Sequence, residues 1–155
     1  MFSSHLANVS LSLGEPGTKI RIENAGKVSE NFRESLIVAH IVAENIARKS
    51  FNRDIIYRGS NPIESSGDSG GLIFALGMLS LLTGKTIRTG ITGTGRINLK
   101  GEVLPVANIR EKALAAKEAG ATMFLLPKEQ GLVLPRDMDY FIVGTVAEAW
   151  KMVSE

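Results

Sequence analysis

The chain has 155 residues, with 18 Lys and Arg against 16 Asp and Glu, and its formal net charge is +2. With 44% hydrophobic and 22% charged residues, the composition is that of an ordinary soluble protein. We expect one domain, residues 1–155, with enough chain to bury a core. The small, scattered charge gives no basis for a nucleic-acid partner. No cysteine is present, which excludes disulfides, thiolate metal sites and a cysteine nucleophile.

Two further features bear on location and cofactors. The only histidines, His5 and His40, lie far apart in sequence, so we expect no metal site and no cofactor. The N-terminus lacks a charged segment followed by an apolar one, which predicts no signal peptide. We therefore expect a cytoplasmic protein, or a membrane-associated one if the chain is cut from a longer, membrane-tethered protein.

In the first part of the chain, alternating apolar and polar residues predict strands on both sides of a long helix. Residues 9–13 and 19–23 alternate in strand fashion, and a strong turn signal at 14–17 separates them. Ser29 is placed to cap a helix over about 30–49, in which we interpret His40 as a structural histidine. A short strand at 54–57 and a polar loop at 58–66 follow.

Residues 67–82, GDSGGLIFALGMLSLL, form the stretch around which the rest is organised. Five small residues lead into an apolar run with almost no polar face, which predicts a helix buried in the middle of the domain. The helix is too short to span a bilayer, and Gly84 is a natural stop for it. Ser69 lies near its start and is therefore either an N-cap or a nucleophile beside an oxyanion hole.

The second half of the chain predicts a mixed order of strands and helices. The expected elements are a strand at 86–92, a hairpin of 96–99 with 102–106, a helix at 108–119 with Asn108 as N-cap and Gly120 as stop, strands at 122–126 and 140–143, and a final helix opened by a capping box at 145–148. This order favours an α/β or α+β fold in one compact unit.

On a helical wheel, Lys112 falls on the apolar face of the helix at 108–119. The residues that share this arc are Ile109, Ala113, Ala115, Ala116 and Ala119. Lys112 either extends its ammonium past the core into water or is desolvated, and desolvation lowers a lysine pKa. A lysine of that second kind can act as a base near neutral pH.

With these two elements in view, the sequence resembles the proteolytic domain of Lon proteases from about Gly26 to the C-terminal helix. Ser69 and Lys112 are separated by 43 positions, which fits the family's spacing between nucleophile and base. The other matches follow in the family's order: Gly67-Asp68-Ser69-Gly70-Gly71, Thr83-Gly84, Thr94-Gly95, Leu99, Gly101, Val103-Leu104-Pro105, Glu111-Lys112, Ala115-Ala116, Ala119-Gly120 and Leu126-Pro127. The resemblance implies a compact domain of mixed sheets and helices.

The resemblance also implies roles for individual residues. Ser69 would be the nucleophile and Lys112 the general base of a Ser–Lys dyad. Gly67, Asp68 and Gly70 would form the nucleophile loop and its oxyanion hole, and Thr94 would support the lysine amine. Members of the family act on polypeptides, assemble as rings that usually have six subunits, and are usually joined to an ATPase module, which would here act in cis or in trans.

The chain departs from the family's pattern at four places. Asp68 stands where many members have Pro, and in this the loop is closest to the archaeal type. Ser66 replaces an acidic residue, Gly70 replaces Ala, and Arg96 replaces Glu. These departures bear on the loop conformation and on the residues that orient the dyad.

Two local motifs resemble other families by coincidence. GDSGG also occurs in chymotrypsin-like proteases, but there a barrel strand and not an apolar helix follows the serine. Residues 83–86 imitate the end of a phosphate loop, yet Leu79 stands where the first glycine is required.

The expected function is therefore a serine endopeptidase that cleaves unfolded polypeptides without ATP. The alternative is a non-catalytic Lon-like assembly or binding module. The presence of both Ser69 and Lys112 favours the enzyme.

Overall fold

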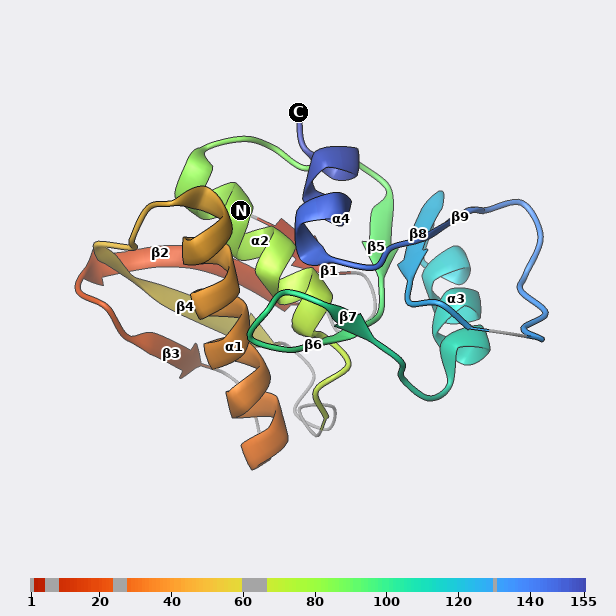
Figure 1. Cartoon of the computed structure of the whole chain (residues 1–155), viewed down its shortest axis with the longest axis horizontal. Helices are drawn as coiled ribbons and strands as arrows, with labels where there is room; N and C mark the ends of the chain where they lie inside the picture. Colours follow the sequence, from red (N-terminus) through yellow and green to blue (C-terminus); the bar gives the residue numbers. More distant parts are fainter. Residues whose placement is uncertain (1, 5–8, 24–27, 60–66, 130) are drawn as a thin grey trace.

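The structure, a computed structural model, describes residues 2–4, 9–23, 28–59, 67–129 and 131–155. His5, Gly26, Ser66 and most of the predicted loop at 58–66 lie outside the described residues. Within the described part, four helices combine with strands in three sheets (Figure 1). The predicted mixed α/β fold is confirmed.

The first sheet has four strands in the order β1, β2, β4, β3. Their bounds are Phe2–Ser4 for β1, Val9–Pro16 for β2, Ile20–Glu23 for β3 and Arg53–Gly59 for β4. β4 pairs antiparallel with β2 and parallel with β3. The predicted strands at 9–13, 19–23 and 54–57 are present. Two strands are longer than predicted because β2 continues through an irregular register after Leu13 to Pro16, which pairs with Arg53 of β4.

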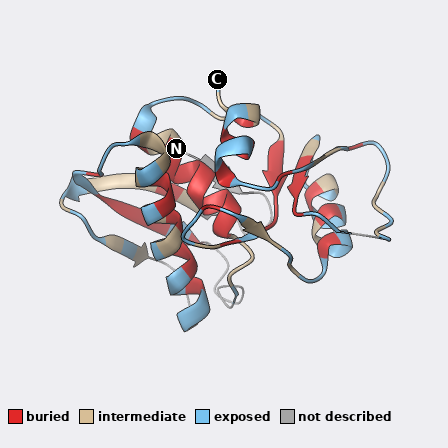
Figure 2. Ribbon diagram, viewed as in Figure 1, coloured by how far each residue is buried: buried red, intermediate tan, exposed pale blue. Residues whose placement is uncertain are grey.

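Two helices pack beside this sheet. Helix α1 (Glu30–Ala47) begins as predicted at Ser29, whose hydroxyl accepts a hydrogen bond from the Phe32 N–H at 3.1 Å. Helix α2 (Gly71–Thr83) ends at Gly84, which has a left-handed φ of 77°. α2 contacts α1, β2, β5, β6 and α4. It is therefore enclosed on several sides, and Figure 2 shows it almost entirely buried.

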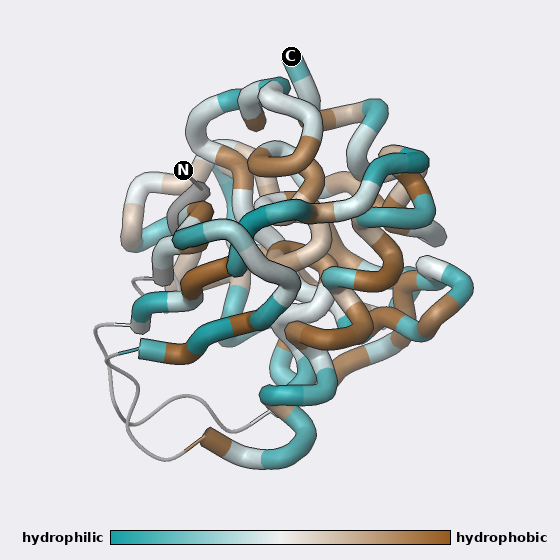
Figure 3. The backbone as a smooth tube through the Cα atoms, turned by 90° about the vertical axis from the view of Figure 1, so that its left-hand side faces the viewer, coloured by the Kyte–Doolittle hydropathy of each residue, from teal (hydrophilic) through white to brown (hydrophobic). Residues whose placement is uncertain are grey.

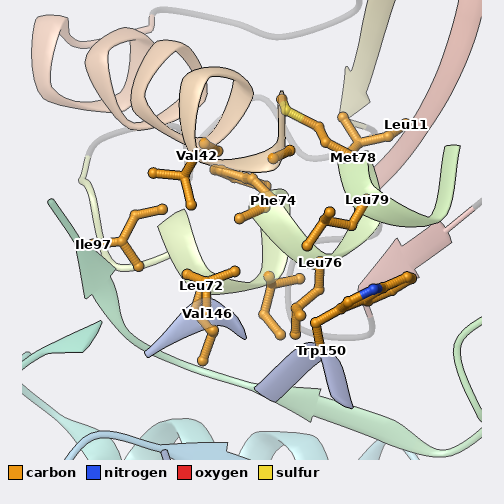
Figure 4. Close-up of a cluster of buried hydrophobic side chains, with 14 of the residues drawn as sticks. Leu11, Val42, Leu72, Phe74, Leu76, Met78, Leu79, Ile97, Val146 and Trp150 are labelled. Carbon is orange, nitrogen blue, oxygen red and sulfur yellow. The ribbon is translucent and has the colours of Figure 1, made fainter. Parts of the chain in front are cut away.

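The core around α2 explains its uniformly apolar sequence. Figure 4 shows side chains of α2 that pack against residues from β2, α1, β6 and α4. The labelled α2 residues are Leu72, Phe74, Leu76, Met78 and Leu79, and the labelled partners are Leu11, Val42, Ile97, Val146 and Trp150. The prediction of a buried central helix is confirmed.

Hydrophilic stretches recur along the outer turns of the chain (Figure 3).

A second, smaller hydrophobic cluster lies around α3 (Ile109–Glu118). It packs on a parallel sheet of β5 (Ile91–Gly93), β8 (Met123–Leu126) and β9 (Asp139–Ile142), in the order β5, β8, β9. The predicted strands at 122–126 and 140–143 are confirmed with small shifts. In Figure 1, α3 and this sheet lie together at the end of the molecule away from β2 and β3.

The predicted strand at 86–92 is wrong in its extent. Residues 86–88 instead meet the C-terminus: the Arg88 N–H donates to the Val153 carbonyl at 3.0 Å, and the Glu155 N–H donates to the Thr86 carbonyl at 2.8 Å. Gly90, with a φ of 81°, then turns the chain, and β5 begins at Ile91. The pairing partner of this segment lies at the far end of the sequence.

The predicted hairpin and final helix are both present in modified form. β6 (Arg96–Ile97) and β7 (Val103–Leu104) pair antiparallel but are shorter than predicted. Helix α4 (Val146–Val153) begins at Thr145, whose hydroxyl accepts from the Glu148 N–H at 3.0 Å. The Glu148 carboxylate accepts from the N–H of Gly144, not from that of Thr145, at 3.3 Å. The capping box is thus confirmed for the threonine and displaced by one residue for the glutamate.

His40 packs inside the structure, in keeping with its predicted structural role. Its ring lies against that of Phe51, with centroids 4.8 Å apart and the planes tilted by 32°, and Nδ1 lies 3.6 Å from a Glu44 carboxylate oxygen. Burial lowers the pKa of His40, and Glu44 opposes that shift. None of the helices in the described ranges combines the length and apolar character needed to cross a membrane.

Candidate active site

The predicted nucleophile lies in the turn that leads into α2. The N-cap residue of α2 is Gly70, which makes no side-chain capping bond. The interpretation of Ser69 as an N-cap is therefore wrong. Ser69 is partly buried and lies one residue before the N-cap, so its side chain does not cap the helix.

The turn is held against the residues that follow β5. The Gly95 N–H donates to the Ser69 carbonyl at 2.9 Å, and the Leu72 N–H donates to the Gly95 carbonyl at 3.0 Å. The Thr94 hydroxyl lies 3.4 Å from the same Ser69 carbonyl. Thr94 is itself tied to β8, because its N–H donates to the Leu125 carbonyl at 2.9 Å. The position of Ser69 therefore depends on residues 94 and 95.

A cleft of about 310 Å³ brings Ser69 and Lys112 together. Its lining residues are Gly67, Asp68, Ser69, Arg96, Pro105, Val106, Ala107, Asn108 and Lys112. Four of the six predicted site residues are in this set. Gly70 caps the adjacent helix, and Thr94 is buried beneath the turn, so neither lines the cleft.

Lys112 reaches the cleft from the first turn of α3. Its Nζ donates a hydrogen bond to the Ala107 carbonyl at 3.0 Å. Burial lowers the pKa of Lys112 from its ordinary value, and the nearby Asp68 carboxylate opposes this by raising it. Among the described residues, no hydrogen bond joins the Lys112 amine to Ser69 or to Thr94. The family resemblance implied that Thr94 supports the lysine amine. In this structure the Thr94 hydroxyl instead contacts the carbonyl of Ser69 and makes no hydrogen bond to the amine.

The predicted apolar face of α3 is narrower than the helical wheel indicated. Ile109, Ala113 and Ala116 are buried as predicted, whereas Ala115 and Ala119 are exposed. Ile109, Ala113 and Ala116 belong to the hydrophobic cluster that α3 forms with its neighbours, and Ala115 and Ala119 do not. Lys112 lies at the edge of this narrow face, which accounts for its partial burial.

Asn108 occupies the predicted N-cap position but does not cap through its side chain. It adopts a left-handed conformation with a φ of 60°, which asparagine tolerates better than most residues. The conformation turns the chain from the 105–107 segment into α3. The Asn108 carbonyl accepts the hydrogen bond from the Lys112 N–H at 3.0 Å.

Backbone donors are available beside Ser69. The Gly71 N–H donates within the turn to the Asp68 carbonyl at 3.3 Å. The N–H groups of Ser69 and Gly70 donate to no acceptor among the described residues. Free N–H groups at the start of a helix are suited to binding a negatively charged oxygen.

Several residues of the cleft wall had no place in the site predicted from the sequence, although Arg96 was named as a departure from the family's pattern and Pro105 as a match to it. Arg96 follows directly after the matched Thr94-Gly95 pair, and its Nε lies 4.0 Å from an Asp68 carboxylate oxygen. Pro105, Val106 and Ala107 form the short connection from β7 to α3, which Figure 1 shows running from the hairpin to the helix. Neither the apolar character nor the length of this connection marks it as part of a site. Among the described residues, no group of three or more His, Cys, Asp and Glu is placed to hold a metal ion.

Residues 15–138 match the family described as the Lon protease (S16) C-terminal proteolytic domain. The chain is 30% identical over 136 residues to a Lon protease of Porphyromonas gingivalis, a match that covers 83% of this chain and 16% of the relative. It is 31% identical over 108 residues to the mitochondrial Lon protease homolog of Homo sapiens, covering 70% of this chain and 11% of that protein.

A third relative, Lon protease 1 of Thermus thermophilus, is 36% identical over 102 residues, which cover 61% of this chain and 13% of the relative. The chain thus spans less than a fifth of the length of each of these relatives. The extent of the family match nevertheless includes the Ser69 turn, α2, the hairpin and α3. The chain belongs to the family of Lon protease (S16) C-terminal proteolytic domains.

Proposed function

We propose that this chain is a serine endopeptidase domain that hydrolyses peptide bonds of unfolded polypeptides, with Ser69 as nucleophile and Lys112 as general base. The observation that carries the proposal is the shared cleft, which Ser69 and Lys112 both line although 43 positions separate them. The lowered pKa of Lys112 and the relatives' name, Lon protease, support the same chemistry.

In the first step, the neutral Lys112 amine takes the proton from the Ser69 hydroxyl as Oγ attacks the carbonyl carbon of the substrate. The carbonyl oxygen becomes negatively charged in the tetrahedral intermediate. The free N–H groups of Ser69 and Gly70 are the donors that we assign to this oxyanion.

In the second step, the Lys112 ammonium gives its proton to the leaving amine, and the peptide C–N bond breaks. An acyl ester remains on Ser69. Water then attacks the ester while Lys112 accepts its proton. As the acyl C–O bond breaks, the Lys112 ammonium returns a proton to Ser69 Oγ, which restores the hydroxyl and the neutral amine, and the released carboxylic acid ionises in water.

This mechanism requires a contact that the structure does not contain. The Lys112 amine donates to the Ala107 carbonyl, and among the described residues no hydrogen bond joins it to Ser69, so a side-chain rotation has to bring the amine and the Ser69 hydroxyl together. Ala107 is exposed, so water can replace the lysine on its carbonyl. We therefore propose that the structure represents a resting arrangement from which a change in the Lys112 side chain forms the dyad.

Three further parts of the proposal concern the context of the domain. An unfolded substrate is cleaved without ATP, because peptide hydrolysis is favourable once a chain reaches the site. Folded substrates need an ATPase module in cis or in trans. We also propose self-association into a ring, and a likeness of the Asp68-Ser69 turn to the archaeal type; both rest on resemblance within the family.

A covalent serine-reactive phosphonate probe tests the proposed function. We expect the probe to modify Ser69, as mapped by peptide mass spectrometry, and cleavage of casein with and without ATP to proceed at the same rate. Ser69→Ala removes both labelling and cleavage. Ser80→Ala, which removes a serine of α2 outside the cleft, leaves them unchanged. Cleavage that persists in folded Ser69→Ala would contradict the proposal.

A further inference from the structure

Arg96 projects a cationic side chain into the cleft from β6. Neighbouring residues fix the Arg96 backbone on two sides. Gly95, the preceding residue, is hydrogen-bonded to Ser69 and Leu72, and Arg96 itself pairs with Leu104 across the hairpin. Residues 105–107, which follow Leu104, line the same cleft. The backbone contacts of Gly95 and Arg96 therefore hold Arg96 in the same cleft as the proposed nucleophile.

The Arg96 guanidinium has little of its hydrogen-bonding capacity in use. Its Nε approaches Asp68 Oδ2 only to 4.0 Å, beyond hydrogen-bond distance, and the two side chains are 47% and 41% exposed. An exposed ion pair of this kind contributes little to the free energy of unfolding. Among the described residues, no acceptor receives a hydrogen bond from the guanidinium. Because Asp68 approaches Nε, the edge formed by Nη1 and Nη2 remains available.

The rest of the wall makes this edge selective. Pro105, Val106 and Ala107 carry no charged or hydrogen-bonding side chain, Asn108 is neutral, and the Asp68 carboxylate lies toward Nε and not toward the edge formed by Nη1 and Nη2. Lys112 has to be neutral for the proposed reaction, so Arg96 is the permanent cation among the lining residues of the cleft. A planar guanidinium edge matches a carboxylate in bidentate geometry, and a neutral amide of the same shape lacks the charge.

We propose that Arg96 selects substrates that carry an acidic side chain close to the scissile bond, through a bidentate contact from Nη1 and Nη2. The inference rests on the proposed function, for which it names the substrate class. It assigns Arg96 no part in bond cleavage.

Pairs of peptides that differ only in Glu or Gln near the cleaved bond test the proposal. The cleaved positions are first mapped on casein, and each position within three residues of the bond is then varied. We expect the parent chain to show roughly tenfold higher kcat/KM for Glu than for Gln at one position. Arg96→Gln lowers this ratio to about one, Arg96→Lys retains part of it, and Arg96→Glu inverts it.

Lys100→Gln is the matched control, because it removes a positive charge from the turn of the same hairpin, outside the cleft lining. We expect it to keep the parent's ratio. Equal rates for Glu and Gln in the parent would overturn the proposal, as would a preference that survives Arg96→Gln. A loss of preference in Lys100→Gln as large as that in Arg96→Gln would assign the effect to net charge and would also overturn it.

A binding measurement separates this inference from the proposed function. The same peptides, carrying a fluorophore, are titrated with the Ser69→Ala chain, and dissociation constants are read from fluorescence anisotropy. We expect tighter binding of the Glu peptide at low salt, weakening as the ionic strength rises, and no difference in Ser69→Ala/Arg96→Gln. If Ser69 proves not to be the nucleophile, the Glu preference in binding still decides the role of Arg96. Equal dissociation constants in Ser69→Ala would refute it.

Discussion

Replacing Lys112 by arginine or methionine separates catalysis from folding. Removal of a general base costs roughly 10²- to 10⁴-fold in rate, or about 3–5 kcal/mol of transition-state stabilisation. Arginine is no substitute, because its guanidinium does not lose a proton in the working range. We therefore expect both Lys112→Arg and Lys112→Met to lose at least about 100-fold in peptide cleavage, measured as kcat/KM with a fluorogenic peptide.

The effect of the same changes on stability is small. The hydrogen bond that Lys112 donates goes to the carbonyl of exposed Ala107, which water can satisfy, so its loss costs about 1 kcal/mol or less. Methionine keeps the apolar stem against α3 and removes a partly buried charge. Urea unfolding of Lys112→Met should therefore give a free energy within about 1 kcal/mol of the parent value.

The pH dependence follows from the direction of the Lys112 pKa shift. Burial lowers this pKa below 10.5, and the reaction needs the neutral amine, so activity should rise with pH to a midpoint below 10.5. Between the lowered pKa of the folded chain and 10.5, Lys112 is protonated in the unfolded chain and already neutral in the folded one. Stability therefore also rises with pH there, an effect absent from Lys112→Met. Substantial cleavage by folded Lys112→Arg would refute the assignment of the base.

Two further predictions concern the scaffold. Gly93→Ala should lower the free energy of unfolding by roughly 2–4 kcal/mol in urea, because a Cβ at Gly93 would lie 2.5 Å from the Leu125 carbonyl oxygen in the adjacent strand. Gly144→Ala is the control and should be close to neutral, because the nearest atom to its Cβ would be 3.6 Å away. Leu76→Ala should cost roughly 3–5 kcal/mol because Leu76 is 1% exposed in α2, and Leu114→Ala, at a residue 45% exposed on α3, should cost under about 1 kcal/mol; equal losses for the two leucines would contradict the packing described for α2.

Local sequence signals predicted helix α1 and the start of α4 well. Ser29 caps α1 and Thr145 caps α4 through short-range hydrogen bonds to residues three positions ahead. The central helix α2 was equally clear, since an uninterrupted apolar run that ends at Gly84 has no exposed face to offer. Interactions of this kind act over a few residues, so they are visible in the sequence.

Elements that depend on distant partners were predicted less well. Residues 86–88 carry a strand-like pattern, but their partners are the last residues of the chain, and Gly90 ends the extended segment. Strand β1 gave no signal because it is only three residues long. Ala115 and Ala119 fit the apolar arc by spacing alone, yet both are exposed in the structure.

For the candidate site, the sequence by itself determined which pair of residues we propose, since Ser69 precedes an apolar helix and Lys112 follows at a spacing that fits the Lon protease family. The tertiary structure alone decided what surrounds that pair. The hairpin brings Arg96 and residues 105–107 to the cleft, and residues 94 and 95 hold the Ser69 turn. It also showed the Lys112 amine on the Ala107 carbonyl and the Thr94 hydroxyl on that of Ser69. These contacts depend on how separate elements pack together, and no local pattern of residue types encodes that packing.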